Sequence, residues 1–208
     1  MSLSQTFETF SQQRVVIVIG GPIASGKSTL ARAVARHLTE RGFVAATIDL
    51  DLVYEMLDHT GAPKHDAATW SRARRIAAAF TDGLLDDGAR VVVAEGDFVE
   101  EGARAEFLTS LRPGLPVRFV TLTVPLATAL VRVEKDKTRG LSRDPVFLSR
   151  HYEEIAESLT ERAATQTDLI LDTSSVTVSE AARAIMDWSL AVAPEAYEPR
   201  ISNETGRS

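Results

Sequence analysis

Residues 15–28 read VVIVIGGPIASGKS, and this segment contains the strongest structural signal in the chain. Its opening run of valines and isoleucines is uninterrupted, which is typical of a β-strand buried on both faces of a sheet. The glycine-rich segment 20–26 then predicts a tight turn. From residue 27 to residue 41 a helix is predicted, because Leu30, Val34 and Leu38 share one apolar stripe. The chain thus begins with a strand, a glycine-rich turn and a helix, which is the start of an α/β protein.

Residues 21–28 match the pattern G-x-x-x-x-G-K-[ST], which binds phosphates when it lies between a strand and a helix. The backbone N–H groups of such a loop surround the β-phosphate, and the positive end of the helix dipole adds to the attraction. Lys27 would reach the β- and γ-phosphates, and the hydroxyl of Ser28 would take one position around Mg²⁺. The loop residues expected to contact a nucleoside triphosphate are Gly21, Ala24, Ser25, Gly26, Lys27, Ser28 and Thr29. This pattern alone does not separate kinases from ATPases or GTPases.

The rest of the chain alternates strand and helix patterns. Further strands are predicted at residues 43–50, 90–94, 117–124 and 168–172. Helices are predicted at residues 52–57, 67–85, 101–111, 125–137, 145–164 and 178–191. This alternation predicts a parallel sheet covered by helices on both faces. Segments 1–13 and 194–208 are polar, and we interpret them as an arm and a tail beside a single domain, residues 14–193.

The composition excludes several classes of function. The chain has 208 residues and no cysteine, which removes disulfides, thiolate zinc sites, iron–sulfur clusters and cysteine nucleophiles. Its net charge is −6, so it lacks the basic footprint of a nucleic-acid binder. No apolar stretch is long enough to span a bilayer, and the N-terminus lacks the pattern of a signal peptide. We therefore expect a cytoplasmic protein with neither nucleic-acid nor membrane partners.

Asp49 and Asp51 stand at the end of the second predicted strand. Two carboxylates at this spacing point to the same side of an extended chain. They lie at the carboxyl edge of the sheet, where open α/β folds bind their ligands. One of them could organise Mg²⁺, and the other could accept the proton of an attacking hydroxyl. The alternative is that Asp51 only caps the helix that follows and Asp49 is only a surface turn residue.

Glu95 and Asp97 repeat this spacing directly after the third predicted strand. A carboxylate in this place commonly holds Mg²⁺ or one of its waters in phosphate-loop proteins. We assign Glu95 to the metal, together with Ser28 and Asp49, and Asp97 to the substrate. The roles of Glu95 and Asp97 could also be exchanged.

A basic cluster follows the fourth predicted strand, on and after the helix expected to run to residue 137. Its members are Arg132, Lys135, Lys137, Arg139 and Arg143. On a continuous helix the first two and Arg139 would share one face. Such cations suit a lid over the phosphates, at about residues 132–150, because they offset the charge of the transferred phosphoryl group. The alternative is a solvated basic face that pairs with its acidic neighbours.

These motifs resemble a known group of enzymes. GPIASGKST at residues 21–29, IDLD at 48–51 and SRDP at 142–145 are similar to the small P-loop kinases related to shikimate, gluconate and adenylylsulfate kinases. The similarity is closer still to chloramphenicol phosphotransferase and the zeta-toxin-like kinases. The substrate-binding signatures of shikimate and gluconate kinases are not found. The segment from Glu95 to Asp97 also differs from a plain Walker B motif.

The resemblance implies a three-layer α/β/α fold whose five-stranded parallel sheet has the order 2-3-1-4-5, with a helical lid between the last two strands. It implies ATP and Mg²⁺ as cofactors. It also implies that Asp51 is the general base or the ligand of the substrate hydroxyl. By the same analogy, Asp172 and Thr173 lie near adenine, and we place Arg132 at the nucleotide.

The motifs and the resemblance together predict a kinase that transfers the γ-phosphoryl group of ATP to a hydroxyl of a small molecule. Asp51 would accept the proton, while Lys27, Arg139 and Arg143 would stabilise the transition state. An antibiotic, a sugar-like metabolite, a nucleoside, a nucleotide or a nucleotide sugar could be the acceptor. The hypothesis from another class is a nucleotide-binding regulatory ATPase. A GTPase is disfavoured because the chain has no N-K-x-D motif after a strand.

Overall fold

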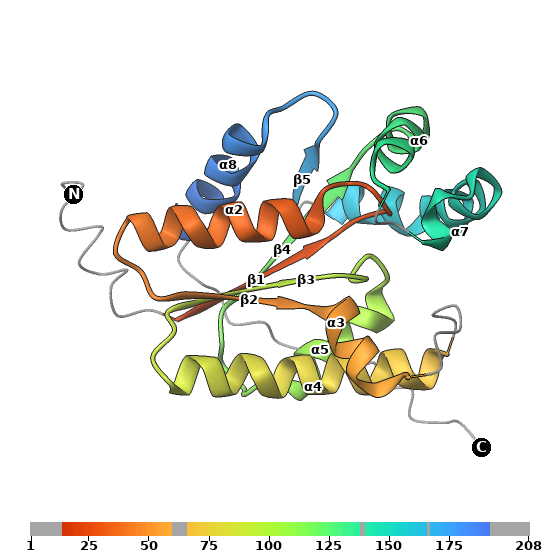
Figure 1. Ribbon diagram of the computed structural model, residues 1–208. Helices are drawn as coiled ribbons and strands as arrows, with labels where there is room; N and C mark the ends of the chain where they lie inside the picture. The colour runs from red at the N-terminus through yellow and green to blue at the C-terminus, as the bar shows by residue number, and fades with distance from the viewer. Residues whose placement is uncertain (1–13, 60–65, 138–139, 166, 192–208) are drawn as a thin grey trace, which may run out of the picture.

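Strand β1 (Val15–Gly20) is the central strand of a five-stranded parallel sheet with the order β2-β3-β1-β4-β5 (Figure 1). The other strands are β2 (Ala45–Asp49), β3 (Val91–Glu95), β4 (Val117–Thr123) and β5 (Leu169–Asp172). This computed structural model describes residues 14–59, 66–137, 140–165 and 167–191, so the expected arm 1–13 and tail 194–208 lie outside the described residues. The expected fold class and strand order are confirmed.

Helices cover both faces of the sheet (Figure 1). One face carries α2 (Lys27–Glu40) and α8 (Val178–Ala191), and the other carries α3 (Leu50–Leu57), α4 (Ala67–Asp86) and α5 (Glu101–Ser110). Near the carboxyl ends of the strands lie α6 (Leu126–Lys135), the 3₁₀ helix η1 (Leu141–Arg143) and α7 (Pro145–Thr165). None of the described helices is long and apolar enough to cross a membrane.

The side chains of β1 alternate between two hydrophobic cores. Val15, Ile17 and Ile19 pack with residues of α2 and α8, whereas Val16 and Val18 pack with residues of α3, α4 and α5. Because both faces of the strand are covered, every residue of β1 is buried. This explains why the strand is an uninterrupted apolar run. Each core also fixes the helices that begin at the carboxyl edge of the sheet.

A third apolar cluster packs α6 and α7 against the loop after β1. It joins Ala24 of that loop to Ala129 of α6 and Leu148 of α7. Ile23 and Tyr152 are partly buried against the same cluster. The helices that form the two ends of the expected lid are therefore anchored on the glycine-rich loop itself.

A buried ion pair joins α5 to the start of β5. Arg104 donates to both carboxylate oxygens of Asp168, at 2.9 and 2.7 Å, and the two side chains are only 3% and 1% exposed. Thr121 of β4 completes the network by donating to the same carboxylate at 2.7 Å. The Nε of Arg104 donates to the carbonyl oxygen of Phe98 at 2.7 Å. The network thus fixes the turn that follows Glu95.

Most of the predicted boundaries differ from the observed ones by one or two residues, and two of these differences affect residues expected at the site. The second strand ends at Asp49 and not at residue 50, because the Asp49 carboxylate caps α3 by accepting the N–H groups of Asp51 and Leu52 at 2.9 and 3.3 Å. The helix expected to reach residue 137 ends at Lys135, where Asp136 takes up an extended conformation. Arg132 and Lys135 therefore lie on α6, whereas Arg139 lies outside the described residues, so a face shared by all three is not observed.

Candidate active site

The glycine-rich loop connects β1 to α2 as the motif predicts. Gly21 has a φ of +149°, and a Cβ there would lie 2.7 Å from the carbonyl oxygen of Leu122, so only glycine fits between β1 and β4. Gly26 occupies the N-cap position of α2 and has no side chain that could engage the first-turn N–H groups. These N–H groups lie at the positive end of the helix dipole, where phosphate binds favourably.

Lys27 begins α2 and bends back over the loop. Its Nζ donates to the carbonyl oxygen of Gly21 at 2.9 Å and to that of Pro22 at 3.1 Å. The ammonium group is thus held above the turn by weak, exchangeable acceptors. Phosphate oxygens could replace these carbonyls and would form stronger, charge-assisted hydrogen bonds.

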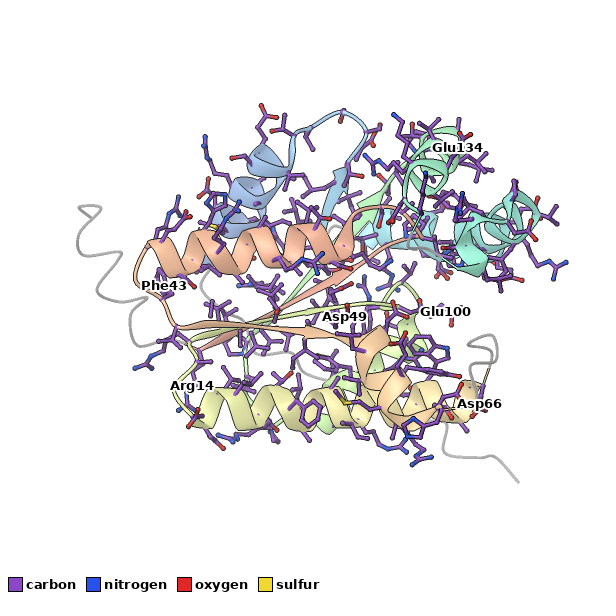
Figure 2. The ribbon with its side chains drawn as sticks, viewed as in Figure 1. Arg14, Phe43, Asp49, Asp66, Glu100 and Glu134 are labelled. Carbon is purple, nitrogen blue, oxygen red and sulfur yellow. The ribbon has the colours of Figure 1, made fainter. Side chains whose placement is uncertain are left out.

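Ser28, Asp49 and Glu95 come together at the carboxyl edge of the sheet. Asp49 and Glu95 are direct partners in the register of β2 and β3, and Figure 2 shows Asp49 where β2 passes into α3. Burial raises the pKa of Glu95 to about 7, a hydrogen bond from Ser28 lowers it, and the charge of Asp49 raises it again. The structure therefore brings together the three residues assigned to the metal from the sequence.

The turn after β3 packs directly on the start of α3. Gly96 has a φ of +151°, and a Cβ there would lie 2.6 Å from the Cβ of Leu50. Asp51 is exposed in the first turn of α3, and Asp97 is half-buried in the turn after β3. The two acids assigned to the substrate thus follow two adjacent strands. Asp49, and not Asp51, is the N-cap of α3, so the capping alternative for Asp51 is wrong.

A cavity of about 330 Å³ lies beside the loop, between the start of α2, the end of α6 and the segment after β5. Arg132 crosses one wall and donates to the carbonyl oxygen of Ala24 at 3.0 Å. It also donates to the hydroxyl and carbonyl oxygens of Thr173, at 3.0 and 2.6 Å. The structure thus places Arg132 and Thr173 at one cavity that is continuous with the phosphate loop.

Asp172 and Arg143 are expected site residues that do not line this cavity. The Asp172 carboxylate turns back on its own chain and accepts the N–H and hydroxyl of Ser174 at 2.8 and 2.7 Å, which lowers its pKa. Asp172 is not among the residues that line the cavity. Arg143 is exposed on η1, and Arg139 lies outside the described residues.

Two residues of α7 outside the predicted set of site residues also contact the loop. His151 Nε2 accepts the N–H of Ile23 at 3.2 Å, and the Tyr152 hydroxyl donates to the carbonyl oxygen of Ile23 at 3.0 Å. Burial is the main cause of a lowered pKa of His151, and the charges of Lys27 and Asp97 also act on it. No motif marks these residues, because their partner is more than a hundred positions away.

The architecture occurs in solved structures of small kinases. The shikimate kinase from Acinetobacter baumannii in complex with shikimate is 22% identical, with a TM-score of 0.57, covering 88% of this chain and 97% of that chain. The tunicamycin resistance protein from Deinococcus radiodurans is 17% identical, with a TM-score of 0.59, covering 90% and 100%. The APS kinase from Mycobacterium tuberculosis in complex with AMPPNP and APS is 17% identical, with a TM-score of 0.58, covering 86% and 99%.

The sequence itself matches one family model. No curated protein matches the chain in sequence. The model for the AAA domain matches residues 16–149, which is more than half of the chain and includes the phosphate loop and both acidic pairs. This chain therefore belongs to the AAA domain family, and its fold is that of the small P-loop kinases.

Proposed function

We propose that this protein is a kinase that transfers the γ-phosphoryl group of ATP to a hydroxyl group of a small molecule. The observation that carries the proposal is the meeting of Ser28 with Asp49 and Glu95 at the edge of the sheet. A phosphate loop with carboxylates beside its serine has the parts that hold a metal-bound triphosphate. Asp51 and Asp97 follow the adjacent strands β2 and β3, and they would serve as groups for a second substrate.

ATP would lie along the loop, with its phosphates at the first turn of α2 and its base end toward the cavity. Arg132 and Thr173 form the wall of that cavity and are fixed by their mutual hydrogen bonds. Lys27 would exchange its two carbonyl partners for oxygens of the β- and γ-phosphates. Its charge would then offset the negative charge on the phosphoryl group during transfer.

The residues at the sheet edge fit Mg²⁺. Mg²⁺ prefers oxygen ligands and is usually held by one or two carboxylates together with substrate phosphates. Ser28, Asp49 and Glu95 offer one hydroxyl and two carboxyl groups, and burial followed by the charge of Asp49 raises the pKa of Glu95, an effect that a bound cation would oppose. When bound, the cation would neutralise charge on the β- and γ-phosphates.

The acceptor would lie beside Asp51 and Asp97, over the place where the first turn of α3 meets the turn after β3. Its hydroxyl oxygen would form the new bond to the γ-phosphorus as the bond to the ADP oxygen breaks, and the hydroxyl proton would pass to Asp51. Asp97 would hold a second polar group of the acceptor. Arg139 and Arg143 belong to the expected lid, and we propose that they approach the γ-phosphate when ATP is bound. An antibiotic hydroxyl and a nucleoside or nucleotide sugar are the acceptor classes to compare first.

The test is mass spectrometry of a mixed pool of metabolites and antibiotics after incubation with Mg-ATP and the protein. The matched control is Lys27→Ala, which removes the phosphate-contacting ammonium group. We expect an acceptor that gains one phosphoryl group with the wild type and not with the variant. Hydrolysis of ATP to ADP with no phosphorylated product from any pool would contradict the kinase and favour a regulatory ATPase.

A further inference from the structure

Both backbone groups of Ile23, the third residue of the phosphate loop, are held by side chains of α7. His151 accepts its N–H at 3.2 Å, and Tyr152 donates to its carbonyl oxygen at 3.0 Å. His151 and Tyr152 are consecutive, so one turn of α7 fixes the orientation of both peptide groups around Ile23. The partly buried Tyr152 ring also packs against the apolar cluster of Ala24 and Leu148, which shields these hydrogen bonds from water.

The protonation states of the two side chains suit these hydrogen bonds. His151 can accept at Nε2 only when it is neutral there, and burial and then the charge of Lys27 lower its pKa. Asp97 and Glu154 act in the opposite direction but are smaller causes. Burial raises the pKa of Tyr152 to about 12, so its hydroxyl keeps the proton that it donates. At neutral pH both contacts are therefore available.

The segment that these contacts hold is strained. Ala24 has a φ of +64°, and it is the only non-glycine residue with a positive φ among the described residues. This left-handed region is unfavourable for an L-residue, whereas glycine adopts it freely. The carbonyl oxygen of Ala24 accepts from Arg132 of α6 at 3.0 Å. Three side chains thus hold consecutive backbone groups on both sides of the strained residue.

We propose that His151 and Tyr152 are positioning residues which, together with Arg132, hold Ile23 and Ala24 of the phosphate loop in the nucleotide-binding conformation. This inference rests on the proposed function, because it takes the loop to bind ATP. A loop that is already ordered loses less conformational entropy when the phosphates arrive. The strain at Ala24 is then offset by contacts from α6 and α7, and His151 and Tyr152 affect nucleotide affinity through the backbone of the loop.

The test compares Mg-AMPPNP affinities by isothermal titration calorimetry. Tyr152→Phe keeps the ring and removes the donor, and His151→Leu removes the acceptor. We expect each variant to lose about 2- to 10-fold in affinity, the effect of one net hydrogen bond. His151→Gln retains an acceptor oxygen and should lose less than His151→Leu. The matched controls are His37→Leu in the last turn of α2, where His37 pairs with Glu40, and Glu157→Gln at an exposed position of α7, and both should leave affinity unchanged.

The decisive measurement adds Ala24→Gly to each background, because glycine does not need the clamp to adopt a positive φ. We expect Tyr152→Phe to cost less than twofold when it is combined with Ala24→Gly. Equal losses with and without Ala24→Gly, or no loss in either α7 variant, would overturn the proposal. Failure of the wild type to bind Mg-AMPPNP would instead overturn the proposed function. Amide hydrogen exchange at Ile23 in the nucleotide-free protein then still tests the clamp: exchange must be faster in Tyr152→Phe and His151→Leu than in the wild type.

Discussion

Asp49 and Glu95 face each other as register partners at the carboxyl ends of β2 and β3, so two carboxyl groups share one partly desolvated site. Burial and the charge of Asp49 raise the pKa of Glu95 to about 7. The hydrogen bond from Ser28 and the charge of Lys27 act in the opposite direction and lower this pKa. In the nucleotide-free protein this arrangement costs stability. The cost is understandable if the site is organised for a cation and for phosphates, since a divalent cation would compensate both carboxylates.

Glu95→Gln is expected to stabilise the nucleotide-free protein at high pH. The pKa of Glu95 is about 7 in the folded state and 4.5 in its ordinary state, so the folded protein binds more protons between these values. Its stability therefore falls as pH rises through this window, by up to about 3 kcal/mol. The Tm of Glu95→Gln should exceed that of the wild type clearly at pH 8 and little at pH 4.5. An equal Tm difference at both pH values would contradict this assignment.

Asp49 is expected to have two separable roles. Asp49→Asn keeps a good N-cap for α3 but removes the charge beside Glu95, whereas Asp49→Ala removes both. Loss of a cap costs about 1 kcal/mol. Urea unfolding should therefore find Asp49→Ala less stable than Asp49→Asn by about that amount. Both variants should weaken the Mg²⁺ dependence of nucleotide binding. Equal stabilities of the two variants would show that the cap contributes nothing.

Asp51→Asn is expected to remove phosphoryl transfer and leave nucleotide binding intact. The Asp51 side chain is exposed in the first turn of α3, and Asp51 is not a residue of the phosphate loop. Loss of a general base typically costs about 10²- to 10⁴-fold in rate. Mg-AMPPNP affinity should stay within about twofold of the wild type. Loss of even one net hydrogen bond to the nucleotide would change the affinity by at least about that factor. The matched control is Asp87→Asn at the far end of α4, and wild-type turnover by Asp51→Asn would exclude the proposed role.

Asp168→Asn is expected to destabilise the whole domain. It leaves the buried Arg104 guanidinium without its charged partner, and removing one member of a buried pair costs about 3–5 kcal/mol. Urea unfolding measures this loss. The double variant Arg104→Met with Asp168→Leu removes both charges and should recover part of it. An Asp168→Asn protein within about 1 kcal/mol of the wild type would show that the network is not an effective ion pair.

The amino-acid sequence was sufficient to predict the strands, the helices around them and the phosphate loop. Each of these depends on neighbours close in the chain: the β-branched run of β1, the glycines around Pro22 and the lysine that opens α2. The two acidic pairs could be placed at the sheet edge for the same reason, since they follow strands directly. The strand order was implied by family resemblance, because periodicity does not specify which strands are neighbours.

The tertiary structure was needed wherever a side chain finds a partner far along the chain. Asp172 stands next to Thr173, yet its carboxylate turns to Ser174, while Arg132 reaches Thr173 across the cavity wall. His151 and Tyr152 lie 128 and 129 residues from Ile23, and no local pattern connects them to the loop. Sequence determines local conformation through sterics and periodicity, which act over a few residues. The packing of α6 and α7 on the loop decides that His151 and Tyr152 meet Ile23. It also sets the pKa values of these two side chains and holds the strained backbone of Ala24.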